Sequence, residues 1–208
     1  MIVSTGNLKA WAAVIIAVAA AVAISMALAT DAEARRFVTK TKTFSSPAAI
    51  SFPGPSTGPA NPYPSTIPVS FKPGSRVADV NLTLNDFQSN NPDDVSVMVA
   101  RGQTNQGVMA DAGGSHDLFD ISITLDDEAP IRVSDNNPIG APGQGFNVVV
   151  APARYGADWP APAPSALSVF DGKDPNGTWQ LFVVDDGFGD DPATIGGWSL
   201  KIKAKVPR

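Results

Sequence analysis

The chain of 208 residues contains no cysteine and a single histidine. Without cysteine there is no disulfide framework, and very few side chains are left that could hold zinc. The histidine, His116, lies between Ser115 and Asp117 in an aspartate-rich turn. Residues adjacent in sequence do not normally reach the geometry of a Ser-His-Asp triad. We therefore expect a protein that is not an enzyme and has no catalytic residue.

Basic residues are scarce through most of the chain. Between Thr43 and Leu200 the sequence has 6 basic and 18 acidic residues, of which 17 are Asp. A basic patch with interleaved aromatics is absent there, so nucleic acid is not expected as a partner. Apart from Lys9, the remaining positive charge flanks this region, at Arg35, Arg36, Lys40, Lys42, Lys201, Lys203, Lys205 and Arg208. If the first and last strands are neighbours, the domain has a basic end and an acidic body.

The N-terminus has the pattern of a targeting segment. Residues Trp11 to Ala29 form an apolar run without a charge, and Ala32-Glu33-Ala34 is a small-x-small cleavage site. We predict that residues 1–34 are a signal peptide. A retained membrane anchor is the alternative, since a spanning helix needs roughly 17–25 apolar residues. The first reading predicts a secreted protein, and the second a protein anchored to the outer face of a membrane.

The rest of the chain shows strand periodicity and no helical period. Its 19 prolines and 18 glycines suit short strands joined by many turns. We expect a Ser/Thr/Pro-rich strand and loop at 35–65, then an all-β, jelly-roll-like β-sandwich at 66–208, with about eight to ten strands in all. The predicted strands are Phe37–Phe44, Thr66–Phe71, Val77–Leu84, Val95–Ala100, Gly107–Ala110, Leu118–Leu125, Phe146–Val150, Thr178–Val184 and Ile195–Val206, and Asn85–Asp94 is predicted as a polar turn.

The last forty residues carry the clearest pattern. Asn176-Gly177 supplies a turn, since both residues accept a positive φ. Alternation then places Trp179 on one face of the next strand, and Trp198 on one face of the final strand. We expect both tryptophans to pack in the core, with structural roles for Gly177 and Gly197 beside them.

This region resembles the P domain, the β-sandwich that follows the subtilisin-like catalytic domain of proprotein convertases. The matching elements are Phe170, Gly172, Asn176-Gly177-Thr178-Trp179, Leu181, Val183, Asp185 and Gly196-Gly197-Trp198-Ser199-Leu200. The resemblance implies a non-catalytic module that packs against a subtilisin-like protease and binds structural calcium. Two departures are the missing catalytic domain and the missing histidine before the first core strand.

Calcium is the cofactor that the aspartates suggest. Short carboxylates grouped with Gly and Asn in loops suit this oxygen-seeking ion. The candidate ligands are Asp111, Asp126 and Asp127, with Asp94 and Asp185 as weaker candidates. The spacing is not that of an EF-hand, and aspartate also favours turns for backbone reasons alone.

Three functions remain open from the sequence. As a module that binds a secreted or surface protein, the chain should expose an apolar patch, formed by the loops of residues 130–169. As an accessory part of a protease system, it should stabilise a subtilisin-like serine protease. As a carbohydrate-binding jelly roll, it should expose Tyr155 and Trp159, which lie in a Pro/Ala-rich loop. A membrane is a partner only if the N-terminal run is retained.

Overall fold

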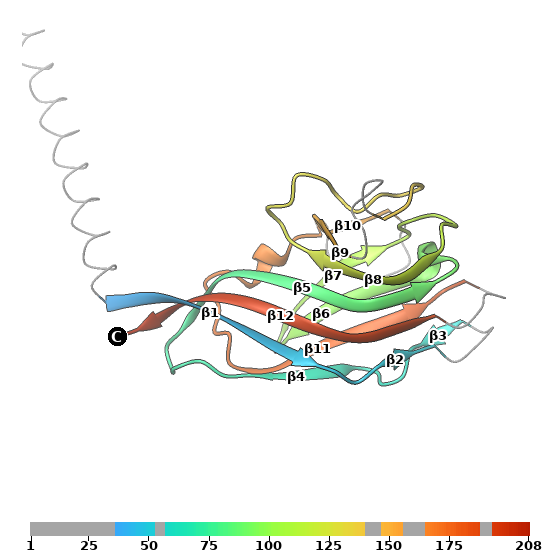
Figure 1. The fold of residues 1–208 in the computed structure, drawn as a ribbon. Helices are drawn as coiled ribbons and strands as arrows, with labels where there is room; N and C mark the ends of the chain where they lie inside the picture. The colour runs from blue at the N-terminus through green and yellow to red at the C-terminus, as the bar shows by residue number, and fades with distance from the viewer. Residues whose placement is uncertain (1–35, 53–56, 140–146, 156–164, 188–192) are drawn as a thin grey trace, which may run out of the picture. The chain divides into compact units, whose positions relative to one another are not determined.

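The computed structural model describes residues 36–52, 57–139, 147–155, 165–187 and 193–208. Two six-stranded sheets pack as a β-sandwich (Figure 1). Twelve strands and two short 3-10 helices occur in the described part of the chain. No helix among these residues is long and apolar enough to cross a membrane.

The first sheet has the strand order β1-β12-β5-β8-β9, and β2 also pairs with β12. β12 and β5 are its two longest strands and pair in antiparallel fashion. Only β8 and β9 run parallel within it. The strands are β1 (Phe37–Ser46), β2 (Ile50–Ser51), β5 (Arg76–Ser89), β8 (Leu118–Leu125), β9 (Asn147–Val150) and β12 (Thr194–Pro207).

The second sheet has the order β10-β7-β6-β11-β3, and β4 also pairs with β11. β6 and β11 lie at its centre, paired from Trp179 opposite Arg101 to Asp185 opposite Val95. The strands are β3 (Gly58–Pro59), β4 (Ser65–Val69), β6 (Val95–Arg101), β7 (Thr104–Ala110), β10 (Ala153–Arg154) and β11 (Gly177–Asp185); the 3-10 helices are η1 (Pro92–Asp94) and η2 (Leu167–Phe170).

The core lies between the sheets and follows the two-residue period of the strands. In β12, Leu200, Ile202 and Ala204 are fully buried while the lysines between them are exposed. Side chains alternate across a strand, so this pattern buries one face and solvates the other. Trp179 and Trp198 are the largest fully buried side chains.

Each buried tryptophan has a partner for its ring N–H. Trp198 Nε1 of the first sheet donates to Ser65 Oγ of the second at 2.9 Å, so this buried bond joins the two sheets. Trp179 Nε1 donates to the carbonyl of Pro175 at 2.9 Å, and its ring contacts Phe170. Leaving such a donor unpaired in the core would cost free energy.

The predicted all-β sandwich is confirmed, and the predicted strands match closely at most positions. One difference is that β5 continues to Ser89, where a polar turn from Asn85 was predicted. Another is that β2, β3 and β10 have only two residues each, too few to show a period in the sequence.

In the predicted strand Leu118–Leu125, strict alternation would place Phe119 on the same face as Ile121, Ile123 and Leu125. The structure instead exposes Phe119 while Ile123 and Leu125 are buried. Asp120 has a φ of 52°, and the register between β5 and β8 shifts in this region. The irregularity turns the start of β8 over relative to its end.

By compactness, residues 39–206 form one unit, which contains nearly all of both sheets. Residues 36–38 group with residues 207 and 208, where the Arg208 N–H donates to the Arg36 carbonyl at 3.1 Å.

We expect a Ser65→Ala change to lower the free energy of unfolding by about 1–3 kcal/mol, because it leaves Trp198 Nε1 buried without an acceptor. Denaturant unfolding measures this loss. A Ser65→Ala/Trp198→Phe double variant should lose less than the sum of the two single variants. The exposed control Ser70→Ala should change stability by no more than about 0.5 kcal/mol. If the two single losses of unfolding free energy simply added in the double variant, Ser65 and Trp198 would not be coupled.

Candidate functional site

Carboxylates gather where β8 ends. Asp126 accepts hydrogen bonds from Asn81 Nδ2 of β5 at 2.8 Å and from the Glu128 N–H at 3.0 Å. Asp127 accepts from the Leu167 N–H at 2.9 Å and the Ser168 N–H at 2.8 Å. All four carboxylate oxygens of this pair therefore already bind N–H donors.

Asp127 caps η2 from a distant part of the chain. The residue at the N-cap position, Ala166, has no side chain that can bond the first N–H groups of the helix. Asp127 supplies both acceptors instead, and its negative charge suits a helix start. Its role is therefore to hold η2, whose Leu167 and Phe170 are buried, against the end of β8.

Like charges surround this group. A hydrogen bond with Asp126 is the main reason that the pKa of Glu128 is raised, and the nearby charge of Asp79 adds to it. Burial is the main reason that the pKa of Asp171 is raised, followed by the charges of Asp79 and Asp127. Full ionisation of this group at neutral pH therefore carries an electrostatic cost.

Asp94 and Asp185 lie where β6 begins and β11 ends. Asp94 accepts from Asn91 Nδ2 at 2.5 Å, and its carbonyl accepts from the Asp186 N–H at 2.9 Å. The buried Asp185 accepts from the Gly187 N–H at 3.1 Å. These carboxylates close the loops at this end of the sheet, so turn chemistry accounts for their positions.

Asp111 follows β7 with a φ of 47°. The turn after it is held by the Gly113 N–H, which donates to the carbonyls of Ser134 and Asp135 at 2.8 and 2.7 Å. Asp126 and Asp127 belong instead to the end of β8, as described above. The hydrogen bonds therefore tie the turn after Asp111 and the Asp126–Asp127 pair to different segments.

The five candidate aspartates are not gathered into one cluster within the described residues. No group of three or more His, Cys, Asp or Glu side chains there is placed to hold a metal ion. A calcium ion takes six to eight oxygen ligands, and several of the oxygens in question accept hydrogen bonds from the protein. Calcium binding stays a prediction from the sequence.

The two glycines predicted to be structural stand where a side chain would be strained, at Gly177, or crowded, at Gly197. Gly177 has a φ of 115°, which an L side chain rarely adopts. The preceding Asn176 accepts from the Phe71 N–H at 2.6 Å, and Arg101 donates to the Asn176 carbonyl. At Gly197, a Cβ would stand 2.6 Å from the Ser46 carbonyl oxygen, so β12 needs glycine where the end of β1 crosses close by.

Of the two aromatics predicted for sugar binding, Trp159 lies outside the described residues. Tyr155 has a partly exposed ring, and its hydroxyl donates to the Val133 carbonyl at 2.6 Å. The hydrogen bond therefore holds Tyr155 against the segment at residues 131–133, and part of the ring remains exposed to solvent.

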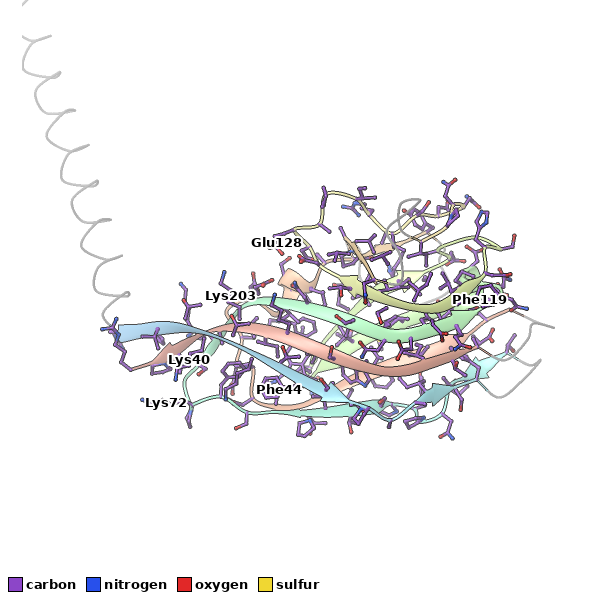
Figure 2. All side chains as sticks on the ribbon, in the orientation of Figure 1. Lys40, Phe44, Lys72, Phe119, Glu128 and Lys203 are labelled. Carbon is purple, nitrogen blue, oxygen red and sulfur yellow. The ribbon has the colours of Figure 1, made fainter. Side chains whose placement is uncertain are left out.

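Large apolar side chains are exposed along β8 and β9 and in the segments that follow them. We call the four of them the apolar edge: Phe119 (68% exposed), Ile131 (55%), Val149 (49%) and Tyr155 (43%). Ile131 and Val149 come together because the Ala151 N–H donates to the Ile131 carbonyl at 2.7 Å. Phe119 projects near the start of β8 (Figure 2). Three of the four belong to residues 130–169, but the sequence pattern assigned Phe119 to the wrong face.

Comparisons with protein-family models, with curated proteins and with solved structures give no significant match. The resemblance to P domains therefore rests on the residues quoted above.

We expect Asp127→Ala to lower stability by about 1 kcal/mol, the usual effect of losing a helix cap. Because the carboxylate binds backbone N–H groups, the loss should be equal in millimolar calcium and in excess chelator. Thermal unfolding of the two proteins in both buffers tests this, and Asp117→Ala, at an exposed turn position, is the control. A loss seen only in calcium would show instead that Asp127 is a metal ligand.

The raised pKa of Asp171 predicts a pH-dependent effect of Asp171→Asn. The unfolded pKa of Asp171 is about 3.9, and its folded pKa is higher. Between these two values the folded state binds more protons than the unfolded state, so the free energy of unfolding falls as the pH rises. The variant should thus be slightly more stable than the parent at neutral pH, by no more than about 0.5 kcal/mol at this exposed position. The difference should vanish below about pH 4. Unfolding curves across this range measure it, and a gain that grew on acidification would contradict the assignment.

Proposed function

We propose that the chain is a non-catalytic module that acts outside the cytoplasm and binds another protein through its apolar edge. The observation that carries the proposal is the exposure of Phe119, Ile131, Val149 and Tyr155 along one side of the sandwich. Single exposed apolar residues are ordinary, but a series of large ones along neighbouring strands is typical of interaction sites.

The rest of the surface makes the apolar edge distinctive. On the outer face of the first sheet, β12 presents Ser199 and Lys201, opposite Thr83 and Asn81 of β5. Thr83 and Thr124 of β8 share a hydrogen bond between their hydroxyls at 2.9 Å. This face is thus polar until it reaches Val149 of β9, which pairs beside Thr124. A partner would meet apolar side chains at the edge and a polar rim beside them, the usual arrangement of a protein interface.

The proposed partner is a subtilisin-like serine protease made as a separate chain. Two features support this choice: the sandwich fold that the P-domain resemblance implies, and the matching residues in the last two long strands. In this arrangement the module would stabilise the folded protease without contributing to catalysis. Fold-level analogy does not fix function, so the partner has to be tested directly.

The test uses a subtilisin-like protease secreted by the same source. It measures whether the chain prolongs the activity of this protease when the protease is heated. We expect the unmodified chain to bind and to lengthen the inactivation half-life. An Ile131→Ser/Val149→Ser variant should bind at least about tenfold more weakly, since each central apolar contact contributes about 1 kcal/mol or more.

The matched control is Tyr63→Ser, which removes an exposed aromatic that packs on Phe182 of the other sheet. This variant should protect the protease as well as the unmodified chain does. Equal loss in both variants would show that the apolar edge is not the contact surface. Absence of any complex would overturn the choice of a protease as the partner.

A further inference from the structure

Positive charge is concentrated at one end of the sandwich. All seven lysines of the described residues are exposed. They lie toward the end of the sandwich at which β5 begins and β6 and β12 finish. At this end Lys205 pairs with Arg76 in the first sheet, and Arg101 pairs with Trp179 in the second. We call this the basic end: Lys40, Lys42, Lys72, Lys173, Lys201, Lys203 and Lys205, with Arg76 and Arg101. In Figure 2, Lys40, Lys72 and Lys203 are labelled toward this same end.

The opposite end carries negative charge. There β5 and β11 finish and β6 begins, as the pairing of Asp185 with Val95 defines it. The acidic residues at this end are Asp86, Asp93, Asp94, Asp185 and Asp186. The basic end also holds carboxylates, at Asp79, Asp126, Asp127, Glu128, Asp171 and Asp174, but the positive charges there outnumber them. Charge is therefore partly separated along the direction of the strands, and an anionic surface would be attracted more to one end than to the other.

The two neighbouring strands β1 and β12 form the most positive side of the basic end. Together they contain five lysines and no acidic residue. Lys40, Lys201 and Lys203 form no ion pair with another described residue. Residues 39–43 of β1 are exposed one after another, so both faces of the strand are open to a large surface there.

The carboxylates nearest to these lysines lie on the β5 side of β12, opposite the side that pairs with β1. Asp79 of β5 stands opposite Lys203. Its charge adds to burial in raising the pKa of Asp171, and adds to the hydrogen bond with Asp126 and to burial in raising the pKa of Glu128. The negative group is thus centred on β5, β8 and η2, and the lysines on β1 and β12. A flat anionic surface would meet the β1–β12 side.

The chain itself indicates which anionic surface this is. The apolar run ends at Ala29, and β1 begins at Phe37. β1 starts where β12 ends, since Ser46 at the far end of β1 lies against Gly197 near the start of β12. The seven connecting residues between Ala29 and Phe37 span at most about 25 Å. If the apolar run remains in a bilayer, the connection keeps the basic end at the membrane surface, at a high effective concentration. An acidic protein would have no such link.

We propose that the basic end binds the anionic phospholipid headgroups of the membrane that holds the N-terminal apolar run. Lipid phosphates would contact the β1–β12 side through Lys40, Lys201 and Lys203. The acidic end would point away from the bilayer and leave the apolar edge free along the side of the sandwich. This proposal does not depend on the proposed protein partner.

The test uses the full chain inserted into nanodiscs of phosphatidylcholine alone, or of phosphatidylcholine mixed with phosphatidylglycerol. Acylation rates of individual lysines, read by mass spectrometry, report contact with the bilayer. We expect Lys201 and Lys203 to react at least about fivefold more slowly in the anionic discs, the factor that a single lysine contributes near such a surface. High salt should abolish the difference, because it screens the attraction. The salt series needs no variant.

A Lys201→Gln/Lys203→Gln variant should also lose the protection of Lys40 in anionic discs. The control Gln88→Glu/Ser115→Glu lowers the net charge equally, at exposed positions away from the basic end, and should keep this protection. Equal acylation rates in the two kinds of disc would overturn the proposal. Protection by polyglutamate but not by anionic discs would also overturn it, and would identify an acidic protein as the partner.

Discussion

The fold depends on one buried hydrogen bond between the sheets and on the packing around it. Trp198 of β12 donates to Ser65 of β4, and both residues are buried in a core with no disulfide to hold the layers together. Because the ring N–H has its acceptor on the opposite sheet, the bond specifies how the two layers face each other. A core of aliphatic side chains alone would tolerate sliding between them, since hydrophobic packing has no direction. Trp198 lies on the buried face of β12, so the lysines at the alternate positions of that strand face outward.

Strands with strict alternation could be predicted from the sequence, and irregular ones could not. β12 alternates along its whole length, so its buried face was predictable from local pattern alone. The start of β8 could not be assigned, because the positive φ of Asp120 and the register shift beside it depend on its pairing with β5. β10 escaped detection for a similar reason: two residues show no period, and the strand exists only because Met109 and Ala110 lie beside it.

The candidate sites show the same contrast: features set by the local sequence could be predicted, and features set by contacts with distant segments could not. The loops at residues 130–169 were expected to expose an apolar patch if the chain binds another protein, and Ile131, Val149 and Tyr155 of this region are exposed. The aspartates gave less information, because a carboxylate in a turn has the same sequence pattern whether it binds a metal or a backbone N–H. Asp127 illustrates this: its partners lie some forty residues further along the chain, at Leu167 and Ser168. Only the fold shows that its two oxygens cap a helix.

The separation of charge along the sandwich is a consequence of antiparallel topology. Antiparallel strands place the end of one beside the start of the next, so residues far apart in sequence share an end of the sheet. Lys205 therefore lies opposite Arg76, and Asp185 opposite Val95, next to Asp93 and Asp94. Like charges gathered in this way repel one another, which costs stability unless something offsets it. At the acidic end, hydrogen bonds to Asp94 and Asp185 offset part of that cost. At the basic end, Asp79 stands opposite Lys203 and Asp174 pairs with Arg101, which offsets part of the repulsion. Lys40 and Lys201 form no ion pair with another described residue, so the proposed lipid phosphates would offset the repulsion that remains.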